Sequence, residues 1–383
     1  MYNSALAIRE RLAKANPQAY EPDLAVSYNN LAILYSDIQR LQESEAMHKL
    51  ALTIRERLAK ANPEAYEPEL AASYNNLANL YSVTQRFEES EEMYKLALAI
   101  RERLAKANPE AYEPDLAASY NNLANLYSAT HRFQESEAMY KSALAIYERL
   151  AKANPEAYES DLADSYNNLA NLYKDTQRFQ ESEAMHKLAL AIRERLAKAN
   201  PHAYEPALAG SYYNLGNLYK KTQRFQECEA MYNSALAIYE RLAKANPQAY
   251  GPDLSGSYYN LAATYYYTQQ YQESEAMYKS AIAIRERLAK ANPQAYGPAL
   301  AVSYNNLAIV YYSTERIQEC EEMFKLAIAI RKHLAEDDPQ LYGSDLAQAY
   351  SNLAFLYNET QRYAESEEMA NTAAAIRERL GIE

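Results

Sequence analysis

Apolar residues recur along the chain with the spacing of one face of an α-helix. In residues 115–130 the large apolar side chains are four, three and four residues apart: Leu116, Tyr120, Leu123 and Tyr127. In residues 134–152 a second apolar face contains Met139, Ala143, Ile146 and Leu150. Both spacings predict amphipathic helices, and the short segment Ala-Thr-His-Arg-Phe between them predicts a turn. The basic unit is therefore a pair of helices.

This pair repeats with a period of 46 residues. Every methionine falls at one phase of that period: Met1, Met47, Met93, Met139, Met185, Met231, Met277, Met323 and Met369. A fixed period of this length is typical of a solenoid, in which each unit packs only on its neighbours. We therefore predict one all-α solenoid domain over residues 1–383. It would hold an unpaired second helix over residues 1–16 and eight full helix pairs from about residue 22 to 383.

Prolines mark the ends of the repeat. Pro109 and Pro114 recur with few exceptions at the same two phases, in segments such as Lys-Ala-Asn-Pro-Glu-Ala-Tyr-Glu-Pro-Asp-Leu-Ala (residues 106–117). Because proline ends a helix or opens one, we expect this whole segment to be the connector between repeats. The leading helix of the third copy should then run from about Asp115 to Thr130.

The pattern Y-x2-L-A-x2-Y … S-x3-Y-x2-A resembles the tetratricopeptide repeat. The residues that carry the resemblance are Tyr120, Leu123, Ala124, Tyr127, Ser136, Tyr140 and Ala143, and they recur along essentially the whole chain. Tyr stands for the usual Trp and Ala for the usual Gly, and the repeat is longer than usual. The sequence is similar to the long-repeat subclass of kinesin light chains and bacterial signalling proteins. The resemblance implies a right-handed superhelix whose leading helices line a concave groove, and it implies binding of extended peptides or partner helices.

Asparagines recur inside the leading helices, where they are poor helix formers. With Tyr120 as position 4, positions 6 and 9 lie opposite the buried face. An amide can pair with both N–H and C=O of an extended peptide. Position 6 gives the candidates Asn76, Asn122, Asn168, Asn214 and Asn260, and position 9 gives Asn79, Asn125, Asn171 and Asn217. At position 6, bonding between neighbouring helices or simple duplication explains the asparagine as well as ligand contact does. Position 9 varies along the chain, which favours a groove role.

Tyrosine and lysine gather at variable positions of the middle and later repeats. The candidates are Tyr213, Tyr259, Tyr266, Tyr267 and Tyr312, beside Lys174, Lys220 and Lys221. Tyrosine is enriched at binding hot spots, and the lysines would favour an acidic side chain or a terminal carboxylate. Since the chain has 38 tyrosines, sequence drift is the alternative.

Composition narrows the function classes. The net charge of −12 argues against nucleic acid, and no apolar run reaches the length of a membrane span. We expect no cofactor, metal or catalytic site, because nucleotide-binding glycine motifs and metal-ligand histidine spacings are missing. Cys228 and Cys320 should be buried free thiols, as in a cytoplasmic protein. His48 and His186 replace an aromatic residue and should be helix-packing residues.

The first helix lacks a partner, so its apolar Leu6 and Ile8 need cover. We expect either self-association through this helix or, preferably, a fragment of a longer protein whose effector domain precedes it. Gly381 suits a helix stop. Three functions stay open: a non-catalytic peptide- or protein-binding scaffold or sensor, the sensing part of a larger signalling enzyme, or a structural array without ligand. Variation at groove positions argues against the last.

Overall fold

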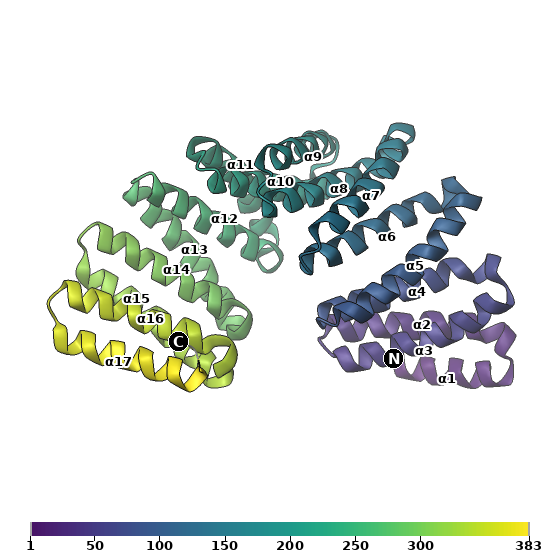
Figure 1. Ribbon diagram of the computed structural model, residues 1–383, viewed down its shortest axis with the longest axis horizontal. Helices are drawn as coiled ribbons and strands as arrows, with labels where there is room; N and C mark the ends of the chain where they lie inside the picture. The colour runs from purple at the N-terminus through teal and green to yellow at the C-terminus, as the bar shows by residue number, and fades with distance from the viewer. Residues whose placement is uncertain (1, 382–383) are drawn as a thin grey trace. The chain divides into compact units, whose positions relative to one another are not determined.

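The computed structural model describes residues 2–381, with side-chain surroundings from residue 5 onward (Figure 1). This part of the chain is all-α, with seventeen helices and no strand. It forms two compact units, which divide between Ile192 and Arg193, and each is described by itself. Met1, which opens the predicted first helix, lies outside the described residues. The helices are α1 (Tyr2–Ala15), α2 (Pro17–Asp37), α3 (Leu41–Ala61), α4 (Pro63–Val83), α5 (Phe87–Ala107), α6 (Pro109–Ala129), α7 (Phe133–Ala153), α8 (Pro155–Asp175), α9 (Phe179–Ala199), α10 (Pro201–Lys221), α11 (Phe225–Ala245), α12 (Pro247–Tyr267), α13 (Tyr271–Ala291), α14 (Pro293–Ser313), α15 (Ile317–Asp337), α16 (Pro339–Glu359) and α17 (Tyr363–Leu380).

Helix pairs are the repeating unit of both halves. After α1, each even-numbered helix is the leading helix of a repeat and the following odd-numbered helix is its second helix. Helices α1–α8 in the first unit and α10–α17 in the second pack mainly on the helices directly before and after them in the chain, as Figure 1 shows within each unit. The all-α array of helix pairs predicted from the 46-residue period is confirmed.

The connector between repeats is much shorter than the sequence led us to expect. Pro109 is the first residue of α6, and Asn108 alone separates α6 from α5. The Asn108 side chain caps the new helix by accepting a hydrogen bond from the N–H of Ala111 at 3.3 Å, and a proline at the first helical position costs nothing because its N–H would be unpaired there. Pro114 lies inside the helix. The predicted start at about Asp115 was therefore wrong by six residues.

The turn within each repeat uses a left-handed residue that is not glycine. In the third repeat His131 has a φ of 59°, and the N–H of Arg132 bonds the carbonyl of Tyr127 at 2.8 Å. This combination of a left-handed residue and a backbone bond to a carbonyl of the last turn is a common way for a helix to end. Seven other turns repeat it with Gln or Glu: Gln39, Gln85, Gln177, Gln223, Gln269, Glu315 and Gln361.

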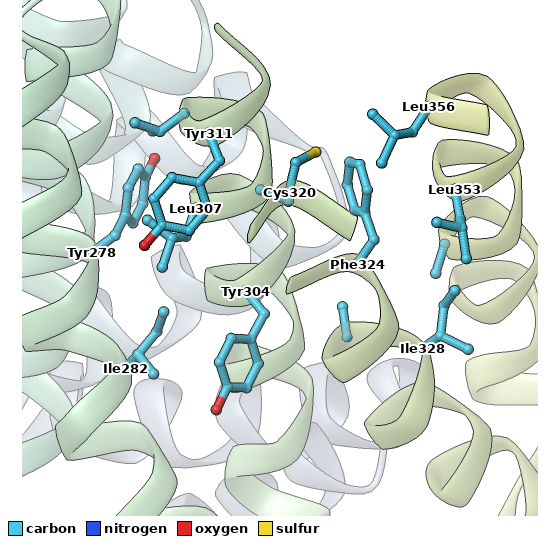
Figure 2. Close-up of a cluster of buried hydrophobic side chains, with 14 of the residues drawn as sticks. Tyr278, Ile282, Tyr304, Leu307, Tyr311, Cys320, Phe324, Ile328, Leu353 and Leu356 are labelled. Carbon is cyan, nitrogen blue, oxygen red and sulfur yellow. The ribbon is translucent and has the colours of Figure 1, made fainter. Parts of the chain in front are cut away.

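Small residues let the two helices of a repeat approach closely. Ala124 and Ser136 are fully buried, and Ser136 Oγ donates to the carbonyl oxygen of Ala124 at 2.8 Å. Larger side chains then fill the space between repeats. Figure 2 shows this in the second unit, where Phe324 and Ile328 of α15 lie between the side chains of α14 and those of α16.

The leucine and isoleucine side chains of α1, at the start of the described residues, are only partly buried. On α1, Leu6 is partly buried but Ile8 remains 51% exposed, so self-association through this helix stays a prediction. At the other end Gly381 adopts a φ of 68° and closes α17, which confirms the predicted helix stop. No helix of the described residues is long and apolar enough to cross a membrane.

Candidate functional site

Position 6 asparagines link neighbouring leading helices. Asn122 Nδ2 donates to Oδ1 of Asn75, at position 5 of the previous repeat, at 2.9 Å, and Asn76 bonds Asn29 in the same way at 3.0 Å. Three further contacts in the second unit join Asn260 to Tyr213, Asn306 to Tyr259 and Asn352 to Asn305. The bond between neighbouring repeats, one of the three explanations left open by the sequence, is thus present for Asn76, Asn122 and Asn260.

Position 9 asparagines bond within their own repeat. Asn217 Oδ1 accepts a hydrogen bond at 2.6 Å from the hydroxyl of Tyr232 on the second helix. Asn79 and Asn125 accept equivalent bonds from the tyrosines 15 residues later. Each acceptor is occupied, but Asn79 and Asn125 remain exposed, so their amide N–H groups still face the surface.

A surface hollow lies where the third and fourth repeats meet in the first unit. Its volume is about 360 Å³. Three predicted groove residues line it, Asn125, Asn168 and Asn171. The remaining lining residues are Ser128, Ala129, Tyr140, Leu172 and Asp175. The structure therefore brings positions 6, 9 and 13 of adjacent leading helices to one concave surface.

The position 5 to position 6 bond is broken at this hollow. Asn121, at position 5 of the third repeat, donates to Ser165 Oγ at 2.8 Å, and its own Oδ1 is buried with no hydrogen-bond partner among the described residues. Asn168 would be its partner if the pattern continued. Instead, the Asn168 amide makes no hydrogen bond to a described residue and borders the hollow. An amide in this position can pair with a peptide group that enters the hollow.

Lys174 stands beside the same hollow but is partly neutralised. Its Nζ donates to Asn171 Oδ1 at 3.2 Å and lies 3.9 Å from Asp175 Oδ1. The attraction for a partner's carboxylate that the sequence suggested is therefore weakened at this end.

In the second unit, Lys220 and the neighbouring amides form a half-buried network. Lys220 Nζ donates at 2.6 Å to Asn260 Oδ1, while Asn260 Nδ2 donates at 2.7 Å to the hydroxyl of Tyr213. Only 8% of Asn260 is exposed. Burial lowers the pKa of Lys220, because removal from water disfavours the charged amine. Lys221 is exposed and Asn214 half-buried.

Aromatic side chains cluster at the turn of the sixth repeat. Tyr267 is 64% exposed and stacks on Phe225 with ring centroids 6.0 Å apart, and Tyr266 lies edge-on to Tyr267 at the same distance. At the junction of the seventh and eighth repeats, Tyr312 contacts the ring of Phe355, which is 54% exposed. Sequence reasoning did not select Phe225 or Phe355; the aromatic residue at position 9 of the eighth repeat was the available signal for Phe355.

Other chemistry-bearing residues lie inside the helix packing. His48 and His186 are buried, as predicted for packing residues. Cys228 and Cys320 are buried free thiols, also as predicted. No group of three or more His, Cys, Asp or Glu side chains in residues 2–381 is placed to hold a metal ion.

Comparison with known proteins agrees with this architecture. Two models of the tetratricopeptide repeat match the chain, one over residues 23–103, 69–149, 207–287 and 253–333 and the other over 162–203 and 346–380. A search of curated protein sequences finds no match.

Solved structures share the fold. BtubC (BKLC) from P. vanneervenii is 25% identical, with a TM-score of 0.54 over 65% of this chain and 92% of that one. The apo form of RapI is 14% identical, with a TM-score of 0.52 over 81% and 98% of the two chains.

A further similar structure is a Signal Transduction ATPase with Numerous Domains from Pyrococcus horikoshii that has a tetratricopeptide repeat sensor. It is 13% identical, with a TM-score of 0.58, over 94% of this chain but 53% of that protein. The family models together cover most of the helix pairs described above, with the period read from the sequence. The chain therefore belongs to the tetratricopeptide repeat family.

Proposed function

We propose that the protein is a non-catalytic binding module that holds an extended segment of a partner protein against its leading helices. The observation that carries this proposal is the hollow between the third and fourth repeats, where Asn168 has an amide group with no hydrogen-bond partner among the described residues. Extended peptides carry one unpaired N–H and C=O per residue, and amide side chains satisfy both without selecting a side chain.

The asparagines then divide into two roles. Asn76, Asn122 and Asn260 hold neighbouring repeats in register through their hydrogen bonds. Asn125, Asn168 and Asn171 line the hollow and would contact the bound backbone. The proposed contact surface in the first unit is thus narrower than the whole row of asparagines.

The second unit would supply side-chain selectivity. Tyr266, Tyr267 and Tyr312 provide rigid aromatic area, which gives large contact energy for little loss of conformational freedom. The amines of Lys220 and Lys221 are the groups that would attract an acidic side chain or a terminal carboxylate. The buried thiols Cys228 and Cys320 suit the reducing cytoplasm in which we propose that the module works.

The test uses peptides selected on the wild-type protein from a displayed library of random sequences. Asn168→Ala should weaken binding of the selected peptides by about tenfold, the worth of one good hydrogen bond, without changing the unfolding midpoint. Asn122→Ala is the matched control, since it removes the same side chain one repeat earlier and should act on stability. Undiminished affinity of Asn168→Ala for every selected peptide would contradict the proposal.

A further inference from the structure

A guanidinium group is held in the same way beside the turn of the repeat at no fewer than five junctions of the described residues. At the third repeat, Arg132 Nη1 donates at 2.6 Å to Glu91 of the previous repeat, and Arg132 Nε donates at 3.0 Å to Glu135 of its own repeat. The guanidinium carbon lies 4.2 Å from the ring centroid of Tyr127. The equivalent arginines with both carboxylates and the ring are Arg86, Arg178, Arg316 and Arg362.

A second cation normally accompanies the first. Lys95 lies one helical turn after Glu91 and pairs with it at 2.7 Å. The hydroxyl of Tyr127 also donates to Glu91, at 3.1 Å. The inner carboxylate of each site is therefore surrounded by an arginine, a lysine and a tyrosine hydroxyl, which together balance its charge.

The junction of the fifth and sixth repeats keeps the acceptors but has neither cation. Gln270 stands where the arginine would be and Asn233 where the lysine would be. Glu229, Glu273 and Tyr265 are all retained, and the Tyr265 hydroxyl donates to Glu229 at 3.0 Å. Neither carboxylate forms an ion pair with any residue that the structure describes.

The substituted glutamine does not take over the role of the arginine. Gln270 Nε2 donates to Thr268 Oγ1, at 2.9 Å, within its own turn. An amide also lacks the charge and the planar fork with which arginine bonds two carboxylates at once. Among the described residues, Glu229 thus accepts only the Tyr265 hydroxyl, and no cation balances the negative charge of Glu229 and Glu273.

A stacked aromatic pair, of which Tyr267 is exposed and Phe225 partly buried, adjoins these carboxylates. Phe225 lies four residues before Glu229 on α11, so both occupy the same face of that helix. Tyr267, which stacks on Phe225 with the ring planes 16° apart, is the only aromatic residue at its position in the eight repeats. The junction of the fifth and sixth repeats therefore departs from the repeat pattern in two ways. Two cations are replaced by neutral residues, and an aromatic surface is added.

We propose that this edge binds an arginine side chain of a partner protein. The guanidinium would bond Glu229 and Glu273 and stack on Tyr265, as the chain's own arginines do at five other junctions. The residue types that would bind it are thus seen holding this group elsewhere in the molecule. A protein segment fits better than a small guanidinium compound because the Phe225 and Tyr267 rings offer contact area to residues next to the arginine. This site is separate from the peptide-binding hollow.

The test measures binding of a short capped peptide, Tyr-Arg-Tyr, by calorimetry at low ionic strength, where exposed charges are least screened. The wild-type protein should bind it, and the same peptide with uncharged citrulline in place of arginine should bind at least about tenfold more weakly. Gln270→Arg should abolish binding, because it restores the internal guanidinium. This variant also restores the contacts made at the other junctions, so loss of binding cannot be ascribed to misfolding.

Two outcomes would overturn the proposal: equal binding of the arginine and citrulline peptides, or full binding by Gln270→Arg. Equal binding of free arginine amide would overturn the assignment to a protein segment. A matched variant should gain binding at the equivalent junction of the second and third repeats. There, Arg132→Gln with Lys95→Asn removes both cations. It should add a second binding event for the arginine peptide, and failure to do so would contradict the assignment of binding to the two carboxylates and the ring.

Discussion

The ring of Tyr232 packs directly against Gly216, in a space that has no room for a side chain. A Cβ placed on Gly216 would lie 2.8 Å from Tyr232 Cε1 and 2.9 Å from Cδ1. Tyr232 is fully buried, and its hydroxyl is fixed to Asn217 at 2.6 Å. Glycine is the exception at position 8, where the other repeats have alanine, and the second, third and sixth repeats pair that alanine with a tyrosine. At Gly216 the Tyr232 ring occupies the space that the alanine Cβ would take.

Gly216→Ala should destabilise the protein despite alanine's better helix propensity. Displacement of a buried ring costs about 1–3 kcal/mol, against a gain of up to about 1 kcal/mol from the helix. The fourth repeat pairs Ala170 with His186 at the equivalent positions, so adding Tyr232→His should recover part of the loss. Urea unfolding of both variants tests this, and a Gly216→Ala protein more stable than wild type would contradict it.

Asn122→Ala should lower the free energy of unfolding by about 1 kcal/mol. The change removes the 2.9 Å bond to Asn75 between adjacent leading helices. Asn168→Ala should leave stability within a few tenths of a kcal/mol, because its amide has no hydrogen bond to a described residue to lose. Chemical denaturation of the two variants side by side measures the difference, and equal losses would show that the bond to Asn75 contributes nothing.

Stability should fall as the pH drops below about 6.5. Burial, aided by the charge of Arg55, lowers the pKa of His48 from 6.5 to about 4. The unfolded chain therefore binds this proton first, and the native state loses about 2 kcal/mol by pH 5 relative to pH 7.5. His48→Phe, which copies Phe324 at the equivalent position of a later repeat, should remove that part of the dependence. A dependence of the same size in the variant would assign it to other groups.

Ala349→Ser should stabilise the protein. Between the first and second repeats, Arg55 Nη1 donates to Ser73 Oγ at 2.6 Å, but the eighth repeat has Ala349 in place of that serine. Arg331 Nη1 is consequently buried with no hydrogen-bond partner among residues 2–381. Restoring the hydroxyl should add about 1 kcal/mol, and Ser73→Ala should cost a similar amount. A lowered unfolding midpoint for Ala349→Ser would show that the arginine is satisfied in another way.

Replacing Tyr267 by serine should change which peptides bind while leaving the fold intact. Tyr267 is largely exposed and stacks on Phe225, so its loss removes contact area for a ligand rather than core packing. Peptides selected by the variant and by the wild type should differ in sequence. Identical selected sequences would separate the aromatic cluster from recognition.

The helical period could be predicted from sequence because it depends on local chemistry. The second helix of the third repeat, expected over 134–152, runs from Phe133 to Ala153. The start of the leading helix was missed because Pro109 and Pro114 can sit inside the first turns of a helix, where the sequence suggested a connector. The left-handed turn residue gave no signal, since glutamine rather than glycine occupies it in most repeats.

The hydrogen-bond partners of the asparagines depend on how far neighbouring helices are rotated, which the sequence does not encode locally. The period alone leaves open whether Asn122 bonds Asn75 or a ligand. It also cannot show that Asn121 turns to Ser165 instead of continuing the pattern. The hollow that Asn168 borders lies at that exception.

The most direct measurement is the response of side-chain amide NMR signals in the first unit to a library-selected peptide. Our account predicts that the amide signals of Asn125, Asn168 and Asn171, which line the hollow, shift on peptide addition, while that of Asn122, bonded to Asn75, stays in place. Peptide-induced shifts confined to the second helices, with the Asn168 signal unmoved, would contradict it.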